Sequence, residues 1–499
     1  MTRLTQPGGP QLIAYADRLG GSIDSLRVLL EGPLTGVFSG VHLLPFFTPY
    51  DGADAGFDPR DHSTVDPRLG TWADVRALGA GHVVVADVIV NHMSVDSAQF
   101  EDVRRRGRQS LFLPMFLTFA SVFPKGASES ELARIYRPRP GLPFTTVVAG
   151  DERRLFWTTF TPSQIDINLR QPAAWDYITS VIDVLVGAGV SVLRLDAIGY
   201  VGKEAGTDCF MTESAVRCIG TLSEYAHARG ASVLVEVHGH FSNQVSLAEQ
   251  VDYVYDFALP PLLLHALTTG DLGPLADWVG IRPSNAMTVL DTHDGIGVID
   301  VAPHDGRPGL LTAAQIDALV EGIHLRSGGS SRLATGEAAS NLDTYQVNCT
   351  FYDALGRDDA RFLLARLIQL FLPGVPQVYY VGLLAGTNDV ALLGATGVGR
   401  DINRHCYSSD EIEPALARPL VQAQMEALRF RRDHPAFLGH FSASFAGSRG
   451  ELTWRNAQSA ATLRFDALAG RFEMSACSGE STRVLVTDKS LSPDRVQAV

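Results

Sequence analysis

Three acidic side chains stand where separate β-branched runs of the sequence end, and together they could break a glycosidic bond. Asp196 closes one run two residues after Arg194, Glu236 closes the next, and Asp294 follows His293 after a later one. In a parallel barrel the carboxyl ends of the strands meet on one face, where several side chains reach one ligand. Such acids are typical of glycosidases, in which one carboxylate attacks carbon and another protonates the departing oxygen. A separation of about 5 to 5.5 Å would give double displacement with retention of configuration.

The elements that must position these acids are predicted from alternating patterns. Short β-branched runs bounded by Gly, Pro or Asp recur between longer amphipathic stretches, as expected of parallel strands joined by helices in an α/β protein. Eight such runs, with no GxGxxG turn after the first, favour a closed (β/α)8 TIM barrel over an open sheet. The predicted strands are residues 12–17, 41–46, 82–90, 190–198, 232–237, 253–257, 286–291 and 375–381.

Uneven spacing between these strands predicts additional domains. The gap after the third strand is too long for one helical crossover, so it must hold an inserted domain. A second gap, after the seventh strand, is rich in Gly, Ser and Asp and predicts active-site loops, and the tail alternates like a small antiparallel β domain. We expect barrel segments at 1–90, 172–295 and 357–436, an inserted domain at 91–171, a loop-rich insert at 296–356 and a C-terminal β domain at 437–499.

Composition excludes several classes of protein. The 499 residues are 45% hydrophobic and 19% charged, with a net charge of −14, no long apolar run and no long basic run. Binding to nucleic acid and insertion into a membrane are therefore not expected. The first nine residues lack the apolar stretch of an export signal, which indicates a cytoplasmic protein. The five scattered cysteines are expected to be buried thiols, without a disulfide framework or zinc cluster.

A resemblance to a known family narrows these expectations. The segments DVIVNH (87–92), RLDAIGY (194–200), EVHGH (236–240) and LDTHDG (290–295) resemble the four ordered signature regions of the α-amylase superfamily. Four further segments, IYRPRPGLPF (135–144), YDFALPPLLLH (255–265), NLDTYQVN (341–348) and GRDINRH (399–405), are similar to sucrose phosphorylases of glycoside hydrolase family 13. The likeness covers nearly the whole chain and thins in the C-terminal domain and around residues 300–335.

The resemblance implies a retaining glycoside phosphorylase that splits sucrose with inorganic phosphate, and it implies roles for the acids. Asp196 would attack the anomeric carbon, and Arg194 beside it would keep it ionised. Glu236 would act as acid and then as base, with a pKa above its usual value near 4.3. Asp294 would stay charged and bind sugar hydroxyls. The family works without a cofactor, and although Asn91 matches an amylase calcium ligand, no metal is expected here.

The same resemblance implies the binding residues. An anionic co-substrate in a negatively charged protein needs a local arginine or histidine, and Arg139 would bind phosphate bidentately, assisted by Tyr345. Relatives of this kind often form homodimers through the inserted domain, so a homodimer is possible. The remaining substrate-binding residues implied by the family motifs are Asp54, Phe57, His92, Gln164, Arg194, Tyr200, His238, His293, Asp343, Tyr345, Gln346 and Arg400.

Alternative functions stay open at this stage. Thr344 stands where the family usually carries Leu, which leaves open phosphorolysis of sucrose 6-phosphate, glucosylglycerol or glucosylglycerate. Arg326 or Arg332 would then recognise the extra anionic group. An α-glucoside hydrolase or transglucosylase would use the same acids with water or a hydroxyl group as acceptor. A carbohydrate-binding protein on an inactive barrel would have lost an acid, whereas all three are present.

Overall fold

A closed barrel of eight parallel strands forms the centre of the computed structural model, which describes residues 8–52, 54–139, 141–334, 346–478 and 481–491. The strands follow one another around the barrel in chain order, and the last pairs with the first. The predicted (β/α)8 barrel is thereby confirmed. The strands are β1 (Gln11–Ala14), β2 (Gly40–Leu43), β3 (Val83–Ile89), β8 (Val192–Asp196), β9 (Ser232–Val235), β10 (Tyr253–Asp256), β11 (Ala286–Thr288) and β14 (Val375–Tyr379).

The strands end earlier than predicted because the chain leaves the sheet as soon as the polar residues begin. The predicted strand 190–198 is observed as Val192–Asp196, and the predicted strand 286–291 stops at Thr288. Ala197, directly after β8, has a φ of 54°, a left-handed conformation that cannot continue a strand. The residues after each strand therefore form loops at one end of the barrel.

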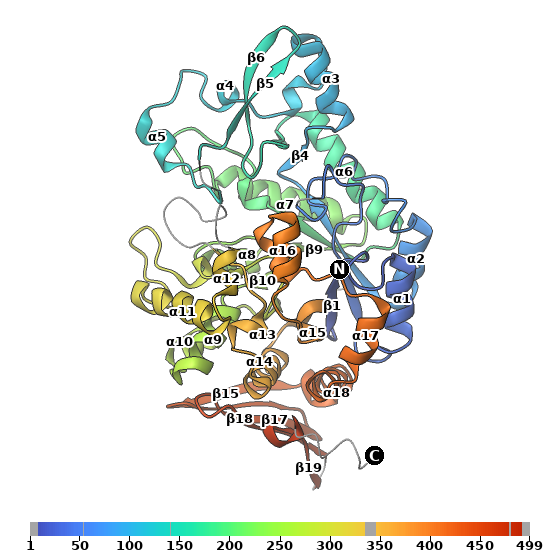
Figure 1. The fold of residues 1–499 in the computed structure, drawn as a ribbon. Helices are drawn as coiled ribbons and strands as arrows, with labels where there is room; N and C mark the ends of the chain where they lie inside the picture. The colour runs from blue at the N-terminus through green and yellow to red at the C-terminus, as the bar shows by residue number, and fades with distance from the viewer. Residues whose placement is uncertain (1–7, 53, 140, 335–345, 479–480, 492–499) are drawn as a thin grey trace.

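Helices surround the barrel and bury their apolar stripes against it (Figure 1). In α6, for example, Ile178, Val181, Ile182 and Leu185 recur at helical spacing and are fully buried. The helices between or after the barrel strands are α1 (Ile23–Glu31), α2 (Trp72–Gly81), α6 (Pro172–Gly187), α7 (Glu213–His227), α8 (Ser242–Ala248), α9 (Leu259–Thr269), α10 (Gly273–Ile281), α14 (Asp359–Phe371), α15 (Tyr380–Leu383), α16 (Val390–Thr396), α17 (Ser409–Leu416) and α18 (Pro419–Asp433), with short 3-10 turns η3 (Ile198–Tyr200), η5 (Gly399–Asn403) and η6 (Pro435–Leu438).

The segment between β3 and α6 rises above one end of the barrel (Figure 1). It contains two antiparallel pairs, β4 with β7 and β5 with β6, and its own apolar cluster around the buried ring of Trp157. Its elements are β4 (His92–Ser94), α3 (Ala98–Arg106), η1 (Gly107–Gln109), η2 (Leu113–Met115), α4 (Phe119–Val122), α5 (Glu129–Arg134), β5 (Phe144–Ala149), β6 (Glu152–Trp157) and β7 (Gln164–Asp166).

The segment after β11 contains more helix than its loop-rich composition predicted. Thr312 and Gln315 form a capping box, which starts a 14-residue helix, α11. Two short strands, β12 and β13, pair antiparallel and bring the chain back toward the barrel. The elements are β12 (Ile296–Gly297), η4 (Ile299–Val301), α11 (Ala313–Arg326), α12 (Ser330–Leu333), β13 (Gln346–Val347) and α13 (Phe351–Ala354).

A five-stranded antiparallel sheet covers the opposite end of the molecule, which confirms the predicted C-terminal β domain (Figure 1). The buried Trp454 donates a hydrogen bond from Nε1 to the Phe371 carbonyl at 2.6 Å, and this bond attaches the sheet to α14. The strands are β15 (His440–Ala446), β16 (Arg449–Arg455), β17 (Ser459–Asp466), β18 (Arg471–Ser478) and β19 (Ser481–Thr487), followed by η7 (Asp488–Leu491).

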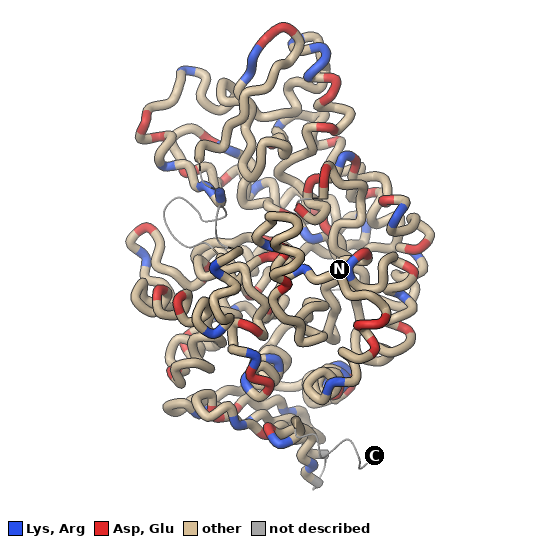
Figure 2. Tube along the Cα trace, in the orientation of Figure 1, with Lys and Arg blue, Asp and Glu red and all other residues tan. Residues whose placement is uncertain are grey.

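The expectations from composition are only partly met. Of the cysteines, only Cys209 and Cys349 are buried; Cys406 is exposed, because it lies in the loop after η5. Acidic and basic residues are interspersed over the whole described chain (Figure 2). Among the described residues, no helix is both long and apolar enough to span a bilayer.

Candidate active site

Arg194 lies beneath the site and contacts three carboxylates. Its side chain is 2% exposed, and its Nη1 donates to Asp87 and, at 2.8 Å, to Asp196 Oδ1. Its Nη2 lies 3.6 Å from Glu236 Oε1. Pairing of β3 with β8 sets Asp87 directly opposite Arg194, so both side chains point to the same side of the barrel wall. One guanidinium therefore sets the positions of all three acids.

Glu236 and Asp196 are fixed beside each other by the backbone between them. Ala197 donates its N–H to Glu236 Oε2 at 2.9 Å, and the left-handed φ of Ala197 aims that N–H across to the neighbouring strand end. Both carboxyl groups also contact the guanidinium of Arg194, which holds them near each other on one side of the barrel.

The charge state of Asp196 differs from the expectation that Arg194 alone keeps it ionised. Burial raises the pKa of Asp196 well above its usual value; Arg194 opposes the rise, while the negative charges of Glu236 and Asp87 add to it. The guanidinium is shared among three carboxylates, so its charge does not neutralise them all. Burial and the neighbouring negative charges therefore work against the charged form of Asp196, and Arg194 works in its favour.

Asp294 stays ionised, as predicted. Burial alone would raise its pKa, but nearby positive groups, Arg400 foremost, hold that pKa well below its usual range. Arg400 Nη1 lies 2.8 Å from Asp294 Oδ1 and 3.9 Å from Asp54 Oδ1, and its Nη2 donates to Gln346 Oε1 at 3.3 Å. Arg400 therefore connects two carboxylates and an amide on one side of the pocket.

Two histidines on the same side are neutral. Burial lowers the pKa of His92 and lowers that of His293 well below its usual value. His92 Nε2 lies 2.9 Å from the Phe57 carbonyl, and the ring of Phe57 stacks on His293 with centroids 4.7 Å apart. A neutral imidazole can donate one hydrogen bond and accept another, which suits a sugar hydroxyl.

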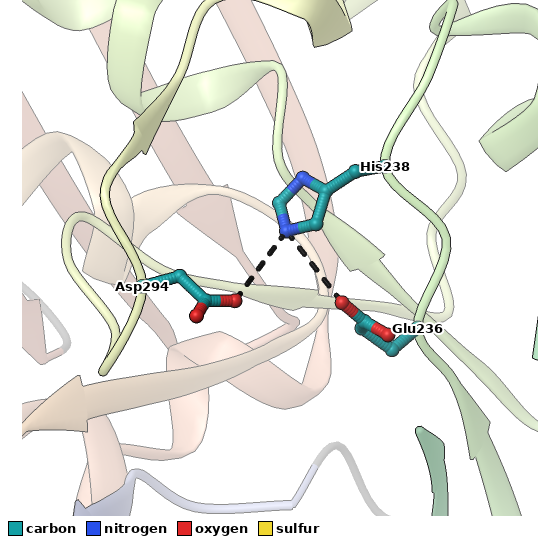
Figure 3. A group of neighbouring side chains, drawn as sticks. All are labelled: Glu236, His238 and Asp294. Carbon is teal, nitrogen blue, oxygen red and sulfur yellow. Dashed lines mark ion pairs between the residues drawn. The ribbon is translucent and has the colours of Figure 1, made fainter. Parts of the chain in front are cut away.

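His238 differs from these two histidines because it lies among acids. Its Nε2 is 3.7 Å from Glu236 Oε1 and 3.9 Å from Asp294 Oδ2 (Figure 3), and its Nδ1 is 3.0 Å from Asp300 Oδ2. Burial disfavours the charged ring, but Asp300, Glu236 and Asp294 outweigh it and raise the pKa of His238. The three carboxylates therefore favour the protonated form of the His238 ring.

These groups line a single pocket whose empty volume, including space open to solvent, is about 850 Å³. Most predicted residues lie in its wall. Gln164 lies behind it, where its Nε2 donates to Asp54 Oδ2 at 2.8 Å, and Arg194 lies beneath it. Asp343 and Tyr345 fall outside the described residues. The predicted residues in the wall are Asp54, Phe57, His92, Arg139, Asp196, Tyr200, Glu236, His238, His293, Asp294, Gln346 and Arg400.

Sequence reasoning missed several contributors. Phe160, Phe210 and Asn348 line the pocket. Asp87 belongs to the DVIVNH motif, but no role was predicted for it. Its position opposite Arg194 on the neighbouring strand would have indicated the ion pair between the two residues. The two arginines that were expected to recognise an extra anionic group of the substrate lie elsewhere. Arg332 pairs with Glu321, and Arg326 Nε donates to the Ala354 carbonyl. Neither is among the residues of the pocket wall: Arg326 is the last residue of α11, and Arg332 lies in α12.

The position that corresponds to an amylase calcium ligand is occupied by an ammonium group. The buried Lys203 donates from Nζ to Asn91 Oδ1 at 3.1 Å, to the Tyr200 carbonyl at 2.7 Å and to the Asp166 carboxylate. These are amide, carbonyl and carboxylate oxygens, which are the ligands that Ca²⁺ prefers. The positive charge that such a cluster needs is therefore supplied by a side chain of the protein itself.

Comparison with known proteins gives concordant results. Residues 35–217 match the family described as alpha amylase, catalytic domain. The chain is 58% identical over 438 residues to sucrose phosphorylase from Agrobacterium vitis, a match that covers 87% of this chain and 90% of that protein. It is 53% identical over 465 residues to sucrose phosphorylase from Bifidobacterium adolescentis, with 92% of each chain covered.

A solved structure shows the same arrangement. The crystal structure of sucrose 6F-phosphate phosphorylase from Thermoanaerobacter thermosaccharolyticum superimposes with a TM-score of 0.88 at 33% sequence identity. The alignment covers 96% of this chain and 98% of that one. The likeness therefore extends over the barrel, the segment after β3 and the C-terminal sheet.

The Lys203 cluster generates a first prediction. Lys203→Met removes the only charge that compensates the buried Asp166 in this cluster, so the free energy of unfolding should fall by about 3–5 kcal/mol. Denaturant unfolding measures this, with the exposed Lys125→Met as a control expected to change it by less than about 0.5 kcal/mol. For the unmodified protein, a calcium chelator should leave the midpoint unchanged, and a lowered midpoint would contradict the assignment.

Proposed function

Because the chain belongs to the sucrose phosphorylase family, which uses the catalytic barrel of the α-amylases, we propose that it splits sucrose with inorganic phosphate. The products are α-D-glucose 1-phosphate and D-fructose, so the enzyme is a hexosyltransferase. The observation that carries this proposal is Arg139, which lines the same pocket as Asp196 and Glu236 and supplies the cation that an anionic co-substrate needs. Phosphorolysis of a related α-glucoside is the second candidate.

We propose Asp196 as the nucleophile of the first half-reaction. One Asp196 oxygen bonds to the anomeric carbon of glucose while the bond from that carbon to the fructosyl oxygen breaks, and Glu236 gives its proton to that oxygen. In this step Asp196 reacts as a carboxylate, and the hydrogen bond that Arg194 donates to it at 2.8 Å favours that form. Asp294 and Arg400 bind the sugar ring as it gains positive charge.

The second half-reaction reverses these roles with a new acceptor. Glu236, now a carboxylate, takes a proton from phosphate while a phosphate oxygen attacks the glucosyl ester and releases Asp196. Because each displacement inverts the anomeric carbon, the product keeps the α configuration. Arg139 favours phosphate over water on the acceptor side.

The first test of this function is a product assay. With sucrose and saturating phosphate, glucose 1-phosphate should be the main product and free glucose should be minor, and omission of phosphate should reverse that ratio. A panel of sucrose, sucrose 6-phosphate, glucosylglycerol and glucosylglycerate identifies the preferred donor, expected to be sucrose. Free glucose as the main product at saturating phosphate would instead make the chain a hydrolase.

The roles of the two acids are tested by substitution. Asp196→Ala should abolish turnover, because no ester can form, and Glu236→Gln should lower kcat by about 10²- to 10⁴-fold for transfer to phosphate and for the reverse transfer to fructose. Asp277→Asn, an exposed acid in α10, is the control and should keep full activity. Measurable phosphorolysis by the Asp196 variant would refute the covalent route.

We further propose a cytoplasmic location and a homodimer. The free thiols of Cys209, Cys218, Cys349 and Cys406 suit a reducing compartment, in which disulfides rarely persist. The segment between β3 and α6 exposes several large apolar side chains, including Leu111 at 85% and Val148 at 57%. Val148 and Leu155 share one face of the β5–β6 hairpin, because strand pairing sets Leu155 opposite Thr146, two residues before Val148. Two copies meeting through this surface would cover it.

The dimer is tested by light scattering. The protein should have twice the chain mass of 53.8 kDa, and the double substitution Leu111→Glu with Val148→Glu should halve that mass. Leu468→Glu, which alters an exposed apolar residue of the C-terminal sheet, is the matched control and should leave the dimer intact. A monomeric mass for the unmodified protein would contradict the proposal.

A further inference from the structure

Asp300 is a buried carboxylate next to the pocket that has no role in the scheme above. It lies in η4, is fully buried and is not part of the pocket wall. Its Oδ1 accepts hydrogen bonds from the Gly239 N–H and from Gln244 Nε2, both at 3.2 Å, and its Oδ2 lies 3.0 Å from His238 Nδ1. A buried carboxylate requires a counter-ion, and the ring of His238 is in hydrogen-bonding position to supply it.

A hydrogen-bonding carboxylate and a stacked aromatic ring fix the orientation of the His238 side chain. Since an ionised carboxylate only accepts hydrogen bonds, Asp300 requires a proton on Nδ1. The ring stacks on Phe257 with centroids 3.9 Å apart, which directs Nε2 at Glu236 Oε1 and Asp294 Oδ2, 3.7 and 3.9 Å away (Figure 3). Both of those oxygens favour a second proton, on Nε2. The raised pKa of His238 agrees with this arrangement.

We propose that Asp300 is a positioning residue that holds His238 as an imidazolium toward the acceptor side, and so makes phosphate a better acceptor than water. The proposal rests on the phosphorylase function given above. Asp300 therefore affects which acceptor receives the glucosyl group, and it does not take part in cleavage of the glucoside.

The charges present during the second half-reaction explain why an imidazolium at His238 would favour phosphate as the acceptor. Once the ester forms, Asp196 carries no charge, but Glu236 has become a carboxylate just where a phosphate dianion must arrive. The repulsion is substantial in a site with little water. An imidazolium beside Glu236 reduces it and can donate from Nε2 to phosphate, whereas a neutral water molecule gains little from that charge. Loss of the charge should therefore weaken phosphate binding and leave hydrolysis nearly unchanged.

The groups around His238 determine its pH dependence. Carboxylates face it from η4 (Asp300), from the end of β9 (Glu236) and from the loop after β11 (Asp294), and Phe257 after β10 adds no charge. The nearest permanent cations act through the acids: Arg194 on Glu236 and Arg400 on Asp294. A pKa raised by folding means that the imidazolium is present below that pKa and is lost as pH rises through it. The KM for phosphate should rise over the same interval.

The test is Asp300→Asn, which keeps the shape and removes the charge. The new amide oxygen can accept from Gly239 and Gln244, and its NH₂ group then faces Nδ1 of His238, which must accept and become neutral. We expect the KM for phosphate to rise about tenfold or more, as for loss of a charge-assisted hydrogen bond. The rate of sucrose hydrolysis without phosphate should stay within about twofold, and the pH at which KM rises should move downward.

Controls separate this role from a structural one. Gln244→Leu removes a hydrogen bond to Asp300 but keeps its charge, so its KM for phosphate and its pH profile should match those of the unmodified enzyme. Asp300→Glu should restore the profile lost in Asp300→Asn. An unchanged KM for phosphate in Asp300→Asn, or equal losses of phosphorolysis and hydrolysis, would overturn the proposal.

A second measurement does not depend on any variant. In the unmodified enzyme, the ratio of phosphorolysis to hydrolysis at constant phosphate dianion should fall between about pH 6 and pH 9, where histidines titrate. A constant ratio over that range would also overturn the proposal. Failure of the underlying function looks different, because the unmodified enzyme would then form no glucose 1-phosphate from sucrose at any pH.

Discussion

The pairing of one buried arginine with several carboxylates is the constraint on which the site depends. Arg194 has almost no contact with water and compensates Asp87 and Asp196 directly while facing Glu236. Removal of this cation would leave three acids buried with too little positive charge, a situation that proteins rarely tolerate. The barrel wall supplies the geometry, because adjacent parallel strands place these side chains at the same height. The shared guanidinium opposes, but does not cancel, the rise that burial causes in the pKa of Asp196.

The remaining charges divide the pocket into two sides. Arg400 with Asp54 and Asp294 forms the side on which we propose that the sugar ring binds, and there Arg400 holds the pKa of Asp294 well below its usual range. The acceptor side has Arg139 and His238, of which only the histidine can change its charge near neutrality. Recognition of glucose should therefore vary little with pH, and the fate of the glucosyl group should vary more.

Much of the fold could be predicted from sequence, because buried parallel strands are β-branched and their polar ends carry motifs. The exact strand ends could not, since Ala197 adopts a left-handed φ that no composition rule anticipates. Residues within motifs were placed correctly in the pocket, as with His92 and Asp294. Asp300 was not found because it belongs to the segment after β11, where the family likeness thins, and its contact with His238 bridges 62 positions. Such contacts become visible only in three dimensions.

Lys203 has a consequence for an enzyme that consumes phosphate. Calcium and phosphate precipitate together, so a catalyst that relied on a bound calcium ion would compete with its own co-substrate for that ion. An ammonium group attached to the chain by its own side chain cannot be leached out or exchanged, whatever the anion concentration. The contacts of Lys203 at this junction between the barrel and the segment above it therefore do not depend on the concentration of free calcium.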